Sequence, residues 1–401
     1  MQYNMGLEGA QELVISKVSR IPRENVSILD AGGRILFENL FADQNLPPYA
    51  QSAVDGFALG SCTTNSNSRY TIKKYLELSD FPDIPLKNGE AVGVLTGGAL
   101  PDGCQAVVPH EKTVVEGDTL TVLEEIKPGN NVKQVGEDFQ QGSLLAQGGI
   151  KIDAGCIGLL AAYGFWKIPV YRQPRVAILS LGLNIISCHL TPKPGQTRDS
   201  NSPFLAALIK QHGGVVASID VISQMDLIKK GTYIDQIIEQ VDLVICTGET
   251  YTQKANEIRL LMDTIGAEII YWGIPIQPGS HNGAAFYKGR PIFALSGNPA
   301  ACAVGYHLFV APALRTMQGL YPYAQRLQAK CINSFSKIAH SRRFVRGYAA
   351  CSSGDWKVTV LPGQKPSMLR SLISCNALID LPPGHSPVTA GTEVSILLLE
   401  S

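Results

Sequence analysis

Three apolar, strand-like runs in this sequence end in small polar residues that suit the binding of an anion. They occupy residues 176–182, 242–248 and 293–299. In an open parallel sheet, ligands bind beyond the carboxyl ends of the strands, where helix N-termini present free N–H groups. In the third run, Ser296 and Asn298 can cap the helix that follows. An ordinary capped turn has the same composition, so these residues alone leave both interpretations open.

Three loops nearer the start of the chain offer carboxylate or hydroxyl oxygens. Asp55 stands beside a glycine, Asp138 follows Gly136 and Glu137, and Thr96 precedes two glycines. Each of these loops is also typical of a surface turn, in which Gly and Asp are common. None of the three therefore indicates a site by itself.

The elements that must position these residues change in character along the chain. Residues 174–318 alternate strands with helices, which predicts a parallel sheet with helices on both faces, a three-layer α/β domain. Short β-like pieces between glycines and prolines predict an inserted all-β domain at 46–142. Residues 1–45 and 143–173 are predicted to form one helical linking domain, interrupted by that insertion. Residues 319–401 are strand-like and predict a small β-barrel.

The composition excludes several classes of partner. Lys and Arg total 34, as do Asp and Glu, so the zero formal charge predicts no general attraction to nucleic acid or anionic lipid. Nine scattered cysteines without a CxxC pair argue against a disulfide framework or a structural zinc site. The apolar run 156–166 is about half the length of a membrane span and predicts a buried helix. We therefore expect a cytoplasmic protein with neither membrane nor nucleic acid as a partner.

The order of the motifs is more specific than any one of them. LPPYAQSAVDGFA is followed by LTGGALPDGCQAVVPHE, VGEDFQQGSLLAQGG, RVAILSLG, RDSN, DLVICTG and LSGNPA. This series resembles the MoeA family, the molybdopterin molybdenumtransferases that also include the E domain of gephyrin. The match runs through residues 46–318, and the stretch 364–371 is similar to part of the family's final domain.

The resemblance implies an elongated, four-domain homodimer. Its active site would lie between the α/β domain of one subunit and the inserted β domain of the other. The implied reaction inserts molybdate into adenylylated molybdopterin and releases AMP. The α/β domain would hold the pterin and its phosphates, and the acidic loops would hold molybdate and a divalent cation such as Mg²⁺, which prefers oxygen ligands. A molybdoenzyme or another protein of cofactor synthesis is a possible partner.

The family's functional residues carry over to matching positions of this sequence. The resemblance implies catalytic roles for Asp55, Thr96, Asp138 and Asp242, of which Asp55 and Asp138 would bind the metal. It also retains Asp199 of the RDSN motif. The residues that it implies for binding molybdopterin are Ser180, Gly182, Thr247, Gly248, Ser296, Gly297, Asn298 and Pro299.

Several charged positions of the family pattern are replaced in this chain. Leu183 and Asn184 stand where the family has Asp and Glu after the first strand. Gln277 and Ser280 replace the two lysines of the family's Lys-Pro-Gly-Lys-Pro segment, and Asn256 replaces an aspartate. A charge-assisted contact to an oxyanion is about twice as strong as a neutral one, so these changes predict weaker anion binding.

The same loops also carry new ionisable groups, Glu249, Lys254 and His281, which rebuild a site or face solvent. Two functions follow from this balance. The retained Asp55 and Thr96 favour a molybdopterin molybdenumtransferase. The replaced residues favour the alternative, a non-catalytic or repurposed member that binds molybdopterin or a partner protein as a carrier or scaffold.

Overall fold

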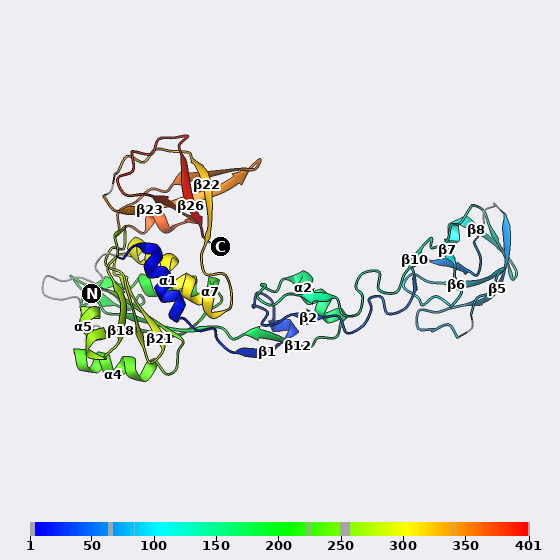
Figure 1. The fold of residues 1–401 in the computed structure, drawn as a ribbon, viewed down its shortest axis with the longest axis horizontal. Helices are drawn as coiled ribbons and strands as arrows, with labels where there is room; N and C mark the ends of the chain where they lie inside the picture. Colours follow the sequence, from blue (N-terminus) through cyan, green and yellow to red (C-terminus); the bar gives the residue numbers. More distant parts are fainter. Residues whose placement is uncertain are drawn as a thin grey trace.

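The structure is a computed structural model that describes residues 5–62, 67–83, 85–222, 225–248, 257–338 and 340–399. Figure 1 shows an elongated molecule. The α/β sheet and the C-terminal β domain lie at one end, the inserted β domain lies at the other, and the linking domain runs between them. Glu249, Lys254 and Asn256 lie outside the described residues.

The α/β domain is built on a six-stranded sheet of order β16-β13-β17-β21-β20-β18. Its strands are β13 (Arg175–Ser180), β16 (Val215–Val221), β17 (Leu243–Gly248), β18 (Glu268–Trp272), β20 (Gly283–Tyr287) and β21 (Arg290–Ser296). Alternate residues of β13 enter two different hydrophobic clusters, Val176 and Ile178 on one face and Ala177 and Leu179 on the other. Both faces are therefore covered, which confirms the three-layer α/β prediction.

The edge of this sheet differs from the parallel arrangement expected from the sequence. The first four strands in the sheet order are parallel, whereas β20 is antiparallel to both β21 and β18. Lys288 and Gly289 connect Tyr287 to Arg290, and both have positive φ, of 48° and 73°. Two such residues form the tight turn that matches the twist of a β-hairpin. The chain therefore reverses here without a crossover helix.

Helices cover both faces of the sheet. They are α1 (Leu7–Lys17), α3 (Asn201–Gln211), α4 (Leu227–Ile237), α5 (Glu257–Thr264), α6 (Pro299–Gly305), a π-helical turn (Tyr306–Val310) and α7 (Ala311–Met317). The buried residues of α1 join the cluster that contains Ile178 and Phe309. Helix α1 therefore belongs to the α/β core and not to the linking domain.

The linking domain contains less helix than the sequence predicts. The two chain segments do pair, since β1 (Arg23–Ser27) is antiparallel to β12 (Lys167–Tyr171) and β2 (Leu40–Phe41) to β11 (Leu144–Ala146). The α-helix that the structure describes in these segments, apart from α1, is α2 (Ala154–Ala162). Only Leu160 of α2 is buried, so the expectation of a buried helix is wrong. Its alanines are exposed, whereas Cys156, Ile157 and Leu159 are half-buried.

Two β structures complete the fold. The inserted domain has the strand order β7-β4-β6-β5-β9-β8, and in the C-terminal region pairing of β23 with β25 closes a five-stranded barrel. Both agree with the predicted all-β insertion and small barrel. The inserted strands are β4 (Gly56–Leu59), β5 (Ser68–Tyr75), β6 (Glu90–Val94), β7 (Ala106–Pro109), β8 (Thr113–Glu116) and β9 (Thr119–Val122).

The barrel packs against the α/β domain, and Phe344 and Leu397 join the core that contains Ile178. Its strands are β22 (Gln325–Cys331), β23 (Arg342–Ser352), β24 (Asp355–Val360), β25 (Ala377–Leu381) and β26 (Glu393–Leu398). Among the helices that the structure describes, none is long and apolar enough to cross a membrane.

Candidate functional site

A pocket of about 640 Å³ lies beyond the carboxyl ends of β13, β17 and β21. The three strands are neighbours in the sheet, so their ends meet at one edge. The structure brings all eight predicted molybdopterin-binding residues to this pocket. They are Ser180, Gly182, Thr247, Gly248, Ser296, Gly297, Asn298 and Pro299.

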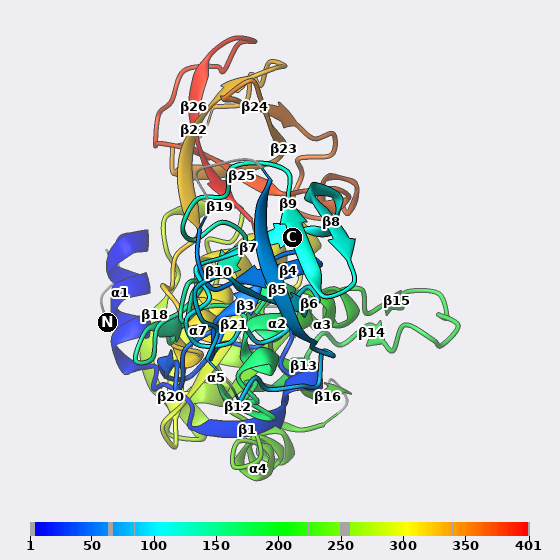
Figure 2. The same ribbon diagram turned by 90° about the vertical axis from the view of Figure 1, so that its right-hand side faces the viewer.

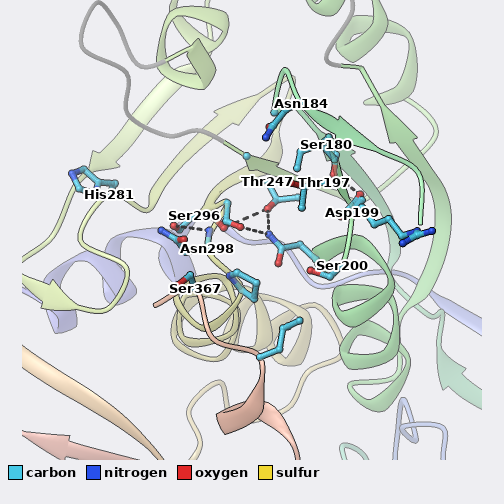
Figure 3. A pocket seen from close by; sticks show the side chains of 18 residues that line it. Ser180, Asn184, Thr197, Asp199, Ser200, Thr247, His281, Ser296, Asn298 and Ser367 are labelled. Carbon is cyan, nitrogen blue, oxygen red and sulfur yellow. Dashed lines mark hydrogen bonds between the residues drawn. The ribbon is translucent and has the colours of Figure 1, made fainter. Parts of the chain in front are cut away.

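A buried carboxylate organises the β13 side of the pocket (Figure 3). Asp199 is 6% exposed and accepts hydrogen bonds from the hydroxyls of Ser180 and Ser202, both at 2.6 Å. The backbone N–H of Ser202 donates to its other oxygen at 3.0 Å. These donors offset the cost of burying the charge, since no Lys, Arg or His among the described residues pairs with Asp199. These hydrogen bonds fix the position of the Ser180 hydroxyl.

An asparagine joins the ends of two of these strands, β17 and β21. The Nδ2 group of Asn201 donates to the hydroxyl of Thr247 at 3.0 Å and to the carbonyl of Gly297 at 2.9 Å. Asn201 is 7% exposed, and its Oδ1 has no hydrogen-bond partner among the described residues. An unpaired buried acceptor costs about 1–3 kcal/mol. This carboxamide, at the start of α3, therefore has an unused acceptor where it lines the pocket.

Two glycines allow the strand ends to approach closely. Gly248 has a φ of 154°, and a Cβ on it would lie 3.1 Å from the backbone nitrogen of Gly182. A Cβ on Gly297 would lie 2.8 Å from the carbonyl oxygen of Gly248. Side chains at these positions would push the strand ends apart. The pocket thus depends on glycine at both places.

The barrel and two further loops contribute the remaining walls. Ser367 and Leu369 line the pocket from the barrel, whose Pro366 carbonyl accepts a hydrogen bond from the Ala300 N–H at 3.0 Å. Asn184, one of the replaced acidic positions, lines it from the arm that carries β14 (Ile185–Ile186) and β15 (Thr197–Arg198), which Figure 2 shows projecting from the domain. Sequence spacing gave no signal for the barrel residues.

His281 also lines this pocket, so one of the new ionisable groups lies at the site. Its Nδ1 lies 3.3 Å from the hydroxyl of Ser280, a replaced lysine position. Gln277, the other replaced lysine position, does not line the pocket, and its carboxamide oxygen accepts a hydrogen bond from Arg343. Among the described residues, the lining of the pocket contains no lysine that replaces them.

Asp55 and Thr96 form a second polar group, in the inserted domain. The Asp55 carboxylate accepts hydrogen bonds from the Thr96 N–H at 2.7 Å and from its hydroxyl at 2.9 Å. The Thr96 N–H, followed by the Thr96 hydroxyl, holds the pKa of Asp55 below its ordinary value. Asp55 precedes β4, a strand of the inserted domain, which lies at the opposite end of the elongated molecule from the α/β sheet (Figure 1). One chain therefore does not unite the two groups.

Asp138 lies in an exposed loop, where its N–H donates to the carbonyl of Leu46 at 3.0 Å. The described residues contain no group of three or more His, Cys, Asp or Glu side chains placed to hold a metal ion. The predicted magnesium ligands Asp55 and Asp138 thus do not form a complete site within the described part of one chain.

Asp242 does not reach the pocket, which corrects its expected catalytic place. It precedes β17, whereas the pocket lies at the carboxyl end of that strand. Its buried carboxylate accepts two hydrogen bonds from Arg172, at 2.8 and 2.9 Å. Asp242 therefore forms a buried ion pair at the opposite edge of the sheet.

Comparison with known families and structures agrees with this architecture. Three family models match successive parts of the chain: the MoeA N-terminal region (domains I and II) over residues 5–164, a probable molybdopterin binding domain over 177–316, and the MoeA C-terminal region (domain IV) over 328–399. The order of these matches follows the order of the domains in the fold.

Named relatives and solved structures cover nearly the whole chain. A molybdopterin molybdenumtransferase of Staphylococcus epidermidis is 30% identical over 386 residues, which are 94% of this chain and 91% of the relative. One from Staphylococcus aureus is 29% identical over 400 residues, 98% of this chain and 95% of the relative. A crystal structure of a molybdopterin biosynthesis MoeA protein from Pyrococcus horikoshii matches with a TM-score of 0.86 and 26% identity, over 99% of this chain and 100% of that one.

The fold and the pocket thus define a multidomain protein of the class whose α/β part is a molybdopterin-binding domain. The chain belongs to the MoeA family.

Proposed function

We propose that this protein is a molybdopterin molybdenumtransferase, which takes adenylylated molybdopterin and molybdate, places the metal on the dithiolene and releases AMP. The observation that carries the proposal is the pocket at the ends of β13, β17 and β21, which gathers the residues that the family resemblance implies for molybdopterin. The names of the relatives support it along nearly the full length of the chain.

The residues of the pocket suit a polar, heterocyclic ligand. Ser180 and Thr247 line the pocket, and their hydroxyls are held by hydrogen bonds to Asp199 and Asn201, respectively. Gly248 and Gly297 let the backbone approach the ligand. In this proposal the α/β domain binds and orients molybdopterin, and it does not depend on the replaced lysine positions.

We propose that the complete site forms between two copies of the chain. The inserted domain, which carries Asp55 and Thr96, lies at the opposite end of the molecule from the α/β sheet (Figure 1), so these residues do not reach the pocket of their own copy. A second observation supports a dimer: Ala154, Ala161 and Ala162 of α2 are exposed, and Trp166 just beyond the helix is 62% exposed. Exposed apolar side chains of this kind are typical of a protein interface.

The dimer is tested by light scattering on the purified protein. The wild type is expected at twice the mass of the 43.1 kDa chain. Trp166→Glu places a charge on the apolar surface and is expected to shift the mass toward the monomer. Ile332→Glu serves as the control, because Ile332 is also exposed, at 50%, but lies in the barrel, next to β22. A wild type that is monomeric at every concentration would contradict the dimer.

We propose a divalent cation, Mg²⁺, at the acidic loops of the inserted domain. Asp55 has a carboxylate with a lowered pKa, which suits a hard cation. A divalent cation there would need further oxygen ligands from the substrate or from a second copy, since the described residues of one chain assemble no such group. We propose Mg²⁺ as an ion that Asp55 and Asp138 help to hold.

We also propose a cytoplasmic location and delivery of the product to a molybdoenzyme or to another protein of cofactor synthesis. All nine cysteines are free in the structure, as expected in a reducing compartment.

Calorimetry and a product assay test the function. Titration of the protein with molybdopterin and with its adenylylated form is expected to show binding, and addition of molybdate and Mg²⁺ is expected to release AMP. Binding without AMP release would instead support the carrier alternative, and no binding would exclude both functions. Asn184→Glu restores an acid that lines the pocket and is expected to raise AMP release. Leu183→Asp is the matched control. It also restores an acid, but Leu183 is 68% exposed and does not line the pocket, so AMP release is expected to stay at the wild-type level.

A further inference from the structure

The linking domain is attached to the α/β domain without a shared hydrophobic core. Its own buried cluster, which includes Leu36 and Leu160, draws on residues between 26 and 170. The clusters of the α/β domain contain residues of α1 and of the barrel, but none between residues 22 and 175. Domains without a large apolar interface move relative to one another by default. The direction of the linking domain must therefore be fixed by something else.

An ion pair between a half-buried arginine and a buried aspartate lies at the root of the linking domain. Arg172 directly follows β12, and its guanidinium donates to both oxygens of Asp242, at 2.9 and 2.8 Å. Asp242 is 3% exposed and also accepts from the Arg175 N–H at 2.8 Å and from Arg290 at 3.3 Å. The hydrogen bonds that Arg172 donates to the Asp242 carboxylate raise the pKa of Arg172, so this side chain stays charged.

The chain segment that enters the linking domain, just before β1, is held by hydrogen bonds next to Arg172. The Arg172 N–H donates to the carbonyl of Pro22 at 3.1 Å, and the Ile21 N–H donates to the carbonyl of Met317 at 2.9 Å. A bidentate pair between a guanidinium and a carboxylate fixes orientation as well as distance, because both groups are planar. Both strands thus leave the α/β domain from one rigid point.

We propose that Arg172, held by Asp242, is a positioning residue that sets the direction in which the linking domain carries the inserted domain. The inference rests on the proposed function, in which Asp55 and Thr96 act at the pocket of a second copy. Figure 1 shows the inserted domain far from this root, so a small rotation at Arg172 produces a large displacement at Asp55. A misplacement of about 1 Å in a catalytic group can cost roughly 100-fold in rate.

The test uses the full-length protein and the variant Arg172→Gln. This variant removes the bidentate contact, while Asp242 keeps Arg290 and the Arg175 N–H, so its charge remains partnered and the fold is preserved. Arg172→Lys retains one charged contact and is the conservative variant. Arg23→Gln is the control, because Arg23 lies on the same ribbon in an exposed ion pair with Glu38 at 3.1 Å.

Three measurements separate positioning from a merely structural role. For Arg172→Gln, AMP release is expected to fall roughly 10- to 100-fold. Calorimetric affinity for molybdopterin, which reports the α/β pocket alone, is expected to stay within about twofold. Small-angle scattering is expected to show a broader distribution of interatomic distances. Arg172→Lys should recover part of both properties, and Arg23→Gln should match the wild type.

Each contrary result has a distinct meaning. Unchanged AMP release and unchanged scattering in Arg172→Gln would overturn the inference. Affinity and AMP release that fall together would assign Arg172 a structural role only. A wild type that releases no AMP would refute the proposed function, and the scattering comparison of Arg172→Gln with Arg23→Gln would then decide the inference by itself.

Discussion

At the residue scale, the central feature of the pocket is a buried acid that relies on hydroxyl and amide donors instead of a cation. Asp199 accepts hydrogen bonds from Ser180 and from two groups of Ser202. The two hydroxyls also lie 3.2 Å from each other, so they can bond to one another when the acid is removed. Hydrogen bonds to a charged group contribute about 1.5–3 kcal/mol each, but burial of the charge offsets part of this.

We therefore expect Asp199→Ala to lower the free energy of unfolding by about 2 kcal/mol, measured by urea denaturation. Ser200→Ala is the matched control, because Ser200 precedes α3 but its hydroxyl makes no capping hydrogen bond. Its effect is expected to stay within about 0.5 kcal/mol. Equal effects of the two substitutions would show that the Asp199 network adds no net stability.

The sequence predicted which strand-end residues lie together at one pocket but not that Asp242 lies away from it, for one physical reason. Ser180, Thr247 and Ser296 end neighbouring parallel strands, so their side chains meet at one edge of the sheet. Asp242 comes before its strand and must lie at the other edge. The barrel residue Ser367 reaches the pocket through the packing of two domains, which no local spacing encodes.

At the element scale, the close approach of β17 and β21 depends on a glycine at the end of β21. A Cβ on Gly297 would lie 2.8 Å from the Gly248 carbonyl oxygen and 3.0 Å from its carbon, both backbone atoms that cannot turn aside. Inserting a methyl group into such a contact typically costs 1–3 kcal/mol. Gly297→Ala is therefore expected to lower stability by about 2 kcal/mol and to weaken molybdopterin binding in calorimetry.

Gly158 provides the contrasting substitution in the same chain. It lies exposed in α2, and a Cβ there would meet nothing within 4 Å. Gly158→Ala is expected to raise the free energy of unfolding by about 0.5–1 kcal/mol, because alanine favours the helix. If Gly297→Ala were as well tolerated, the strand ends would have to be more adaptable than these distances indicate.

The sequence predicted best those strands and helices whose apolar residues are buried within their own domain. The strands of the α/β sheet fit this condition, since their apolar runs are buried on both faces. The linking domain does not: α1 finds its apolar contacts in the α/β core, and the apolar α2 remains largely exposed on one chain. An apolar composition indicates that a segment packs against other residues. It does not indicate which domain, or which copy of the chain, supplies those residues.

At the scale of the whole molecule, the α/β domain and the barrel share one hydrophobic core. Ion pairs within the barrel, and one between the barrel and α1, accompany this core. Arg342 of the barrel donates to Asp380 at 2.7 and 2.6 Å and also pairs with Glu8 of α1. Arg326 pairs with the same aspartate. Burial would raise the pKa of Asp380, but the hydrogen bonds from Arg342 and Arg326 outweigh it and leave the pKa below its ordinary value.

This lowered pKa predicts how stability depends on pH. A carboxyl group whose pKa is lower in the folded state stabilises the protein fully above the unfolded pKa of about 3.9, and this contribution disappears as pH falls through the folded value. Thermal unfolding midpoints of the wild type should therefore fall steeply below about pH 4. In Asp380→Asn the midpoint is expected to be lower at pH 7, because Arg342 and Arg326 lose a charged acceptor. The difference from the wild type should then shrink toward pH 3.

Asp355→Asn is the control for this comparison. Asp355 begins β24 of the same barrel, is exposed, and pairs with no cation among the described residues. Its variant should follow the wild-type curve. If Asp380→Asn instead ran parallel to the wild type at every pH, protonation of Asp380 would not be what weakens the barrel at acid pH. The contact between barrel and α/β domain would then depend on its apolar residues, such as Phe344 and Leu397, which do not titrate.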